Sequence, residues 1–87
     1  MGTYLILHSV MDIHIGEMVR RELKHQERTI AWLARKLECS RSNIYDIFYR
    51  KDIDLFLLIR ISKVLQHNFL KDLMPLLDEP ESTPETT

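Results

Sequence analysis

The chain has 87 residues, of which 45% are hydrophobic, two are glycine and three are proline. This length and composition predict one all-α domain. Two glycines are too few for a glycine-rich loop that binds phosphate. A single cysteine excludes an internal disulfide framework, and the four histidines do not have the spacing of metal ligands. No run reaches the ~20 apolar residues that a membrane span requires. We therefore expect a cytoplasmic protein without metal or cofactor. The net charge of −1 conceals nine Lys or Arg against four acids in residues 20–51, a net of +5, and four acids with no base in residues 78–87.

Residues 1–11 are expected to form an N-terminal extension. Residues 4–10 are a short run rich in β-branched and aromatic side chains, which is typical of a strand. Because a lone strand is not stable in water, we expect this run either to pair with its copy in a second subunit or to form a frayed or packed coil.

The first helix is expected to begin near Asp12 and to end at about His25. Its apolar side chains share one face and are Ile15, Met18, Val19 and Leu23. Its basic side chains fall on the opposite side and are Arg20, Arg21 and Lys24.

Two short helices joined by a tight turn are expected between Thr29 and Tyr49. Thr29 and Ser40 are good N-cap residues for the first and the second of them. The apolar side chains of the first helix recur at i, i+3, i+4 and i+7, at Ile30, Leu33, Ala34 and Leu37. Those of the second recur at i, i+3 and i+4, at Ile44, Ile47 and Phe48. Each helix is therefore predicted to bury one face.

The other face of the second helix carries side chains that can hydrogen-bond or stack. They are Arg41, Ser42, Asn43, Tyr45, Asp46 and Tyr49. Such a set offers donors and acceptors for base edges, a guanidinium for guanine or phosphate, and rings for thymine methyl groups. The pattern predicts an outward-facing surface that reads DNA bases.

The stretch from Thr29 to Tyr49 resembles the helix-turn-helix of phage repressor and Cro proteins, the family of the xenobiotic-response-element-like bacterial regulators. The resemblance covers about Ile15 to Leu73 and implies a compact five-helix, lambda-repressor-like domain. It also implies that the second motif helix enters the major groove with its N-terminal part, while the helix before it lies across the DNA backbone. By position, the resemblance makes Arg41, Ser42, Asp46 and Tyr49 base-facing, with Asn43 and Tyr45 beside them.

Three positions depart from the family pattern. Glu38 stands where the family usually has Gly with positive φ, so either Glu38 is strained by about 1 kcal/mol or the turn differs. Ile30 replaces a Gln that often contacts phosphate and base, so that contact is absent. Arg50 replaces the Gly that commonly follows the recognition helix, which alters the helix cap and adds a positive charge.

Basic side chains in and around the motif are expected to neutralise DNA phosphates and to make affinity depend on salt. They are Arg20, Arg21, Arg28, Arg35, Lys36, Arg50 and Lys51.

After the motif, Asp54 is the expected N-cap of a helix that ends at Leu65. Asn68 is the expected N-cap of a last helix, which Pro75 is expected to bend or end. The helix up to Leu65 has a predicted core stripe of Leu55, Leu58, Ser62 and Leu65. It also has a second apolar stripe of Leu57, Ile61 and Val64. A surplus stripe indicates a subunit interface, and the residues expected in a homodimer contact are Leu57, Val64, Leu70 and Met74.

Together these patterns divide the chain into the extension, a helix-turn-helix DNA-binding domain at residues 12–77 and a disordered acidic tail at residues 78–87. They predict sequence-specific binding to double-stranded DNA by a homodimeric transcriptional regulator of prokaryotic type. We expect no enzyme, because no nucleophile, base and acid arrangement is visible. The alternative is a protein-interaction module or an antitoxin-like partner-binding domain on the same fold.

Overall fold

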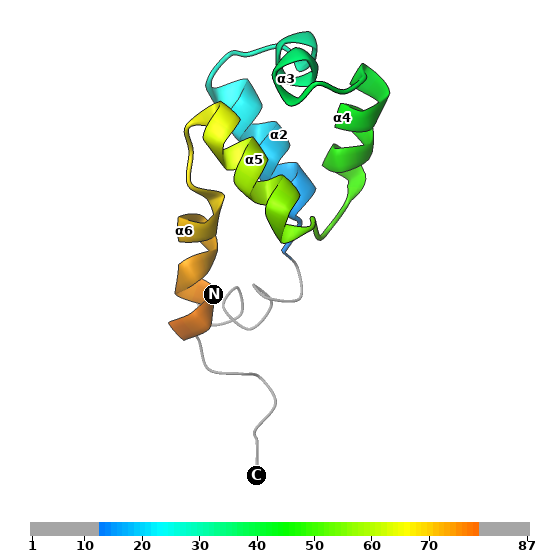
Figure 1. The fold of residues 1–87 in the computed structure, drawn as a ribbon. Coiled ribbons are helices and arrows are strands. Elements are labelled where there is room, and N and C mark those ends of the chain that lie inside the picture. The colour runs from blue at the N-terminus through cyan, green and yellow to red at the C-terminus, as the bar shows by residue number, and fades with distance from the viewer. Residues whose placement is uncertain (1–12, 79–87) are drawn as a thin grey trace. The chain divides into compact units, whose positions relative to one another are not determined.

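The computed structural model describes residues 13–78, which form five α-helices and a short 3-10 helix and contain no strand (Figure 1). The helices are α2 (Ile15–His25), α3 (Ile30–Leu37), α4 (Arg41–Tyr49), α5 (Leu55–Leu65) and α6 (Phe69–Leu73), followed by the 3-10 helix η1 (Met74–Asp78). The expected all-α, five-helix fold is confirmed. None of these helices is long and apolar enough to cross a membrane.

The chain divides into two compact units. One is residues 14–69, with α2 to α5, and it contains both motif helices. The other includes residues 70–78, which hold the rest of α6 and η1. The predicted domain of residues 12–77 therefore extends over both units. The expected extension (1–11) lies outside the described residues, as does the expected tail beyond Asp78.

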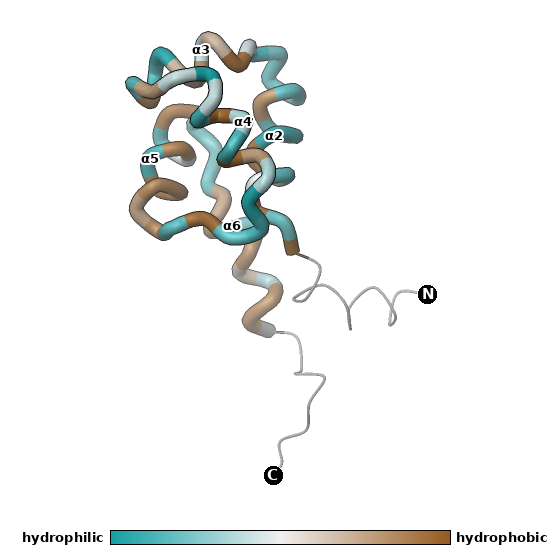
Figure 2. Tube along the Cα trace, turned by 90° about the vertical axis from the view of Figure 1, so that its right-hand side faces the viewer, coloured by the Kyte–Doolittle hydropathy of each residue, from teal (hydrophilic) through white to brown (hydrophobic). Residues whose placement is uncertain are grey.

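The core of the unit 14–69 collects apolar side chains from all four of its long helices. They are Val19, Leu23, Leu33, Ala34, Leu37, Ile44, Ile47, Leu58, Ile61 and Leu65. Ile53, between α4 and α5, and Phe69, the first residue of α6, complete the core. Most of α5 is hydrophobic (Figure 2). Three of its residues, Leu58, Ile61 and Leu65, belong to this core. Burial of these faces, rather than helix propensity, holds such short helices in place.

Four helices begin at a side chain that accepts a backbone N–H, as the sequence predicted for three of them. Thr29, Ser40 and Asp54 accept from the N–H three residues on at 3.0, 3.2 and 3.0 Å. The predicted start of the first helix near Asp12 was wrong. His14 is extended, with φ −134°, and its Nδ1 accepts from the Glu17 N–H at 3.0 Å, so α2 begins at Ile15.

Three helices, α2, α3 and α5, are followed within two residues by a non-glycine residue in the left-handed conformation. These residues are Glu27, Glu38 and Gln66, with φ of 58°, 58° and 52°. In each case the next N–H closes a Schellman turn by donating to a carbonyl five residues back. These bonds join Arg28 to Leu23 at 3.1 Å, Cys39 to Ala34 at 2.9 Å and His67 to Ser62 at 3.0 Å. Of the two alternatives for position 38, a strained Glu38 or a different turn, the structure has Glu38 at positive φ, which is the strained one.

The start of α2 docks on the chain that leaves α4. The Ile15 N–H donates to the Lys51 carbonyl at 2.8 Å and the Gly16 N–H to the Arg50 carbonyl at 2.9 Å. These N–H groups have no partner inside their own helix, so the contact satisfies both. A Cβ on Gly16 would collide with the Ile47 carbonyl oxygen, so only glycine allows this approach.

The core stripe of α5 differs from the predicted one. Leu58, Ile61 and Leu65 are buried, whereas Leu55 is 53% exposed. Ile61 was assigned to the surplus stripe and Leu55 to the core, and both assignments were wrong. Two neighbouring apolar stripes are equivalent in the sequence, and packing against the other helices selects one of them.

Replacing Gly16 by Ala is expected to destabilise the protein by about 1 to 3 kcal/mol, despite the better helix propensity of Ala. The added methyl group meets three backbone carbonyl oxygens, of Ile47, Phe48 and Arg50, which cannot rotate away. Thermal unfolding followed by circular dichroism should show a midpoint lowered by about 4 °C or more. An unchanged midpoint would contradict the close approach of α2 and α4.

Replacing Glu38 by Gly is expected to stabilise the protein by about 0.5 to 1 kcal/mol, because glycine adopts positive φ without steric strain. Lys63→Gly is the matched control, since Lys63 is exposed within α5 and glycine there should cost roughly the same amount. Urea unfolding measures both variants. A Glu38→Gly midpoint at or below that of the natural protein would show that this turn is not strained.

Candidate nucleic-acid interface

The buried and exposed faces of α4 are sharply divided. Ile44 is fully buried and Ile47 is 6% exposed, so this side of α4 belongs to the core. All six side chains predicted to read bases are exposed, and they are Arg41, Ser42, Asn43, Tyr45, Asp46 and Tyr49. Tyr49 is 82% exposed, so its ring is open to solvent. The six therefore share the exposed side of α4. This helix lies along one side of the unit 14–69 (Figure 1).

An ion pair within this surface joins Asp46 to Arg50. The Arg50 Nη2 donates to the Asp46 Oδ2 at 2.6 Å, and both side chains are more than half exposed. The backbone of Arg50 is extended, with φ −82°, so this position has no need of glycine. Arg at this position is therefore unstrained, and it supplies an ion-pair partner for Asp46.

A second ion pair lies on α2. The Glu17 carboxylate accepts from the Arg20 guanidinium at 2.8 and 2.5 Å, and from the Arg21 Nε at 3.3 Å. The hydrogen bond from Arg20 lowers the pKa of Glu17 to about 2, against a smaller opposing effect of burial. The carboxylate is therefore ionised at neutral pH and remains bound to the two guanidinium groups.

The seven predicted phosphate-binding residues have different surroundings, and two of them, Arg20 and Arg28, lie near Tyr45 and Tyr49 of α4. Arg20 and Arg21 pair with Glu17, and Arg28 stacks 4.5 Å from the centre of the Trp32 ring. Lys36 lines a pocket with Val64 and Gln66 at the C-terminal end of α5. Arg35, Arg50 and Lys51 are exposed. Arg50 and Lys51 directly follow α4, so they are the two cations nearest to it in the chain.

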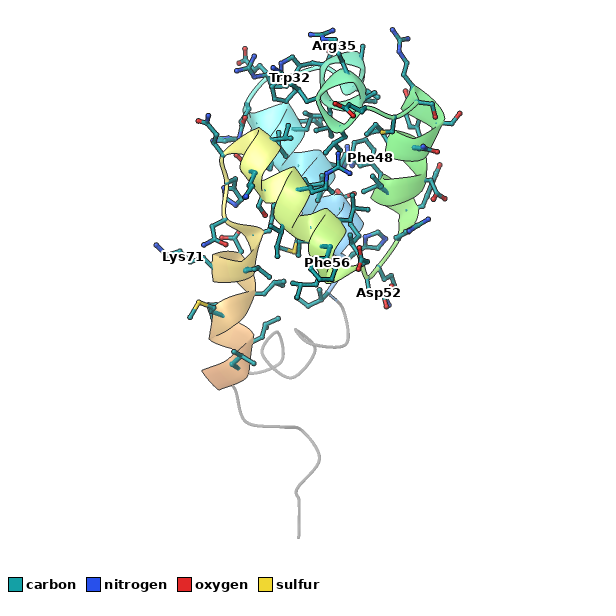
Figure 3. All side chains as sticks on the ribbon, viewed as in Figure 1. Trp32, Arg35, Phe48, Asp52, Phe56 and Lys71 are labelled. Carbon is teal, nitrogen blue, oxygen red and sulfur yellow. The ribbon has the colours of Figure 1, made fainter. Side chains whose placement is uncertain are left out.

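A groove of about 640 Å³ lies between α2, α4 and the start of α3. Its apolar lining comes from Leu23, Ile30 and Phe48, with Tyr45 and Tyr49 on the α4 side. Phe48, labelled in Figure 3, is half-buried and meets the Tyr45 ring edge-on at a centroid distance of 6.3 Å. The sequence placed Phe48 in the core and did not predict this groove.

The residues predicted for a homodimer contact are divided between the two units. Leu57 and Val64 are half-buried on α5 and lie seven residues apart, so they share a flank of that helix. Leu70 and Met74 belong to the other unit, where both are exposed. The largest exposed apolar side chain of α5 is Phe56, at 76%, which the sequence analysis did not single out.

Two further features were not predicted. Gly16 positions α4 without touching its outer face, and its signal in the sequence was only that a glycine stands inside a helical pattern. Lys24 lines the groove between α2 and α4, although it was counted only as a basic residue of the first helix. Within residues 13–78, no group of three or more His, Cys, Asp or Glu is arranged to hold a metal ion.

Comparison with known proteins finds no matching family model, no matching curated protein and no matching solved structure. The resemblance to the phage repressor family therefore rests on the sequence motif and stays a prediction.

Proposed function

We propose that this protein binds double-stranded DNA sequence-specifically, with α4 in the major groove, and regulates transcription. The observation that carries the proposal is the outer face of α4, where six side chains able to contact bases are exposed while the opposite face is buried. A helix of nine residues is about 13 Å long and 10 to 12 Å across, which fits a major groove about 12 Å wide.

The proposed roles follow from position along α4. Arg41 is the first residue of the helix, so its guanidinium extends from the end that enters the groove and can bind guanine O6 and N7. Ser42 and Asn43 in the same turn offer short donors and acceptors. Tyr45 and Tyr49 lie farther along and present rings to thymine methyl groups or hydroxyls to phosphates.

The Asp46–Arg50 pair supports specificity rather than affinity. An unpaired carboxylate beside phosphates repels DNA, whereas the carboxylate of Asp46 is partly neutralised by Arg50 at 2.6 Å. Binding at a preferred site can exchange this pair for contacts from Asp46 to cytosine N4 and from Arg50 to phosphate. A random site offers a phosphate for Arg50 but no cytosine N4 for Asp46. The loss of the Asp46–Arg50 ion pair is therefore not compensated at a random site.

A second candidate function is a protein-interaction module. Leu55 and Phe56 are adjacent, 53% and 76% exposed, and lie at the start of α5. Another protein that bound at this position would cover both apolar side chains. An antitoxin-like role would use this surface and α4 for different partners.

Arg41→Ala and Lys51→Ala separate base reading from phosphate binding. Duplexes selected from a random pool should bind Arg41→Ala about 5- to 150-fold more weakly, with little change on a random duplex. Lys51→Ala should weaken both duplexes equally and reduce the salt slope by about one. Fluorescence anisotropy across a salt series measures both effects.

Lys63→Ala is the control for that experiment, because Lys63 is exposed on α5 outside the proposed DNA contact. Its affinity and salt slope should equal those of the natural protein. No binding to any duplex, or binding independent of salt, would overturn DNA recognition and favour the protein-interaction module.

The proposed regulator acts as a homodimer, since helix-turn-helix proteins commonly bind two half-sites about 34 Å apart. Leu57 and Val64, together with Leu70 and Met74, remain the residues proposed for the contact. Sedimentation equilibrium at high micromolar concentration should give the mass of a dimer, and Val64→Ser should weaken its association. A monomer at that concentration would remove the dimer from the proposal.

A further inference from the structure

The groove between α2 and α4 has an apolar floor that the packing of the core leaves open. Its volume of about 640 Å³ lies within the range of small-molecule sites, roughly 300 to 1,000 Å³. Leu23, Ile30 and Phe48 supply its aliphatic and aromatic surface, and the ring of Tyr45 stands at its side. A flat ring system is the ligand shape that such a surface covers best.

The charges around this groove favour an anion. Arg20, Lys24 and Arg28 line it, and Glu17 is the one acid among the lining residues described. The Glu17 carboxylate already accepts from Arg20 at 2.8 and 2.5 Å, so this pair is internally compensated. Lys24 and Arg28 also line the groove, and no carboxylate among its described lining residues opposes them. The Arg28 guanidinium stacks 4.5 Å from the centre of the Trp32 ring, a contact that leaves its positive charge in place for a ligand.

We infer that the groove between α2 and α4 binds a small amphipathic anion, an aromatic carboxylate or sulfonate, with its rings against Phe48 and Tyr45 and its acid group at Lys24 and Arg28. A phosphate chain alone would leave the apolar floor uncovered, and a neutral hydrocarbon would leave the two cations unused. The combination of both features selects a ligand with one apolar and one charged end.

Occupancy of the groove has a consequence for DNA binding, and this consequence rests on the proposed function. Tyr45 and Tyr49 belong both to the groove and to the proposed base-reading face, and Arg28 belongs both to the groove and to the proposed phosphate contacts. A ligand seated there withdraws these side chains from DNA. The anion would therefore act as an inducer that releases the protein from its site.

The probe for the site is 8-anilino-1-naphthalenesulfonate, whose fluorescence rises when its rings leave water. Its uncharged counterpart, N-phenyl-1-naphthylamine, has the same rings without the sulfonate. The full chain should bind the sulfonate with saturable one-site behaviour. Lys24→Gln should weaken the sulfonate about three- to fivefold and leave the uncharged probe within twofold. Tyr45→Ala should weaken both probes, by about two- to tenfold.

Two control variants locate the bound probe. Lys63→Gln removes an exposed charge from α5, and Phe56→Ser removes the exposed ring at the start of that helix. Neither should change the affinity of either probe. Equal affinity of the sulfonate for Lys24→Gln and for the natural protein would overturn the inference. Loss of binding in Phe56→Ser would also overturn it, because the probe would then occupy α5.

A random duplex added at low salt tests the link to DNA separately. Displacement of the sulfonate by the duplex, with amide resonances of α2 and α4 perturbed by both ligands, supports the inducer role. Simultaneous binding of both overturns that role. If the sulfonate binds in the groove and no duplex binds at all, the proposed function fails while the ligand site stands, so the two failures are distinguishable.

Discussion

The structure depends on the docking of the start of α2 against the end of α4. Two N–H groups that α2 cannot satisfy internally, those of Ile15 and Gly16, bond to the carbonyls of Lys51 and Arg50. The approach is close enough that a side chain at Gly16 would collide with the backbone of α4. Because the bonds join backbone to backbone, they fix the angle at which α4 leaves the core, and with it the direction of its outer face. The same crossing of α2 and α4 opens the groove beside Phe48.

The ends of the helices carry a cost that the core must offset. Glu27, Glu38 and Gln66 adopt left-handed backbone conformations that favour glycine, at roughly 1 kcal/mol each. Each Schellman turn satisfies carbonyl groups at the end of its helix and turns the chain toward the next helix. Arg60 adds to this at α3, where its Nη2 donates to the Leu37 carbonyl at 3.2 Å. A small domain buries a smaller fraction of its surface on folding than a large one, so its free energy of unfolding is low. The tight packing of α2 on α4 therefore contributes a larger share of the stability than it would in a larger protein.

Much of the architecture could be predicted from the sequence because its signals are local. Thr29, Ser40 and Asp54 each bond to an N–H three residues on, so the start of a helix is encoded in four consecutive residues. His14 was missed because an imidazole is an uncommon cap and caps here only through Nδ1. The exposure of Tyr49 and its neighbours follows from the period of 3.6 residues, once Ile44 marks the buried side.

The sequence by itself thus determined the helical class, the starts of three helices and which face of α4 is polar. Only the tertiary structure decided which apolar stripe of α5 enters the core, because Leu55 and Ile61 are equally hydrophobic and differ only in what packs against them. It likewise decided that Gly16 is a contact point rather than a flexible position, and that Lys24 lies at a groove. The physical reason is one of range. A cap or a periodic face is set by residues three or four apart, whereas helix crossing and the space it leaves depend on residues 30 or more positions apart, such as Gly16 and Ile47.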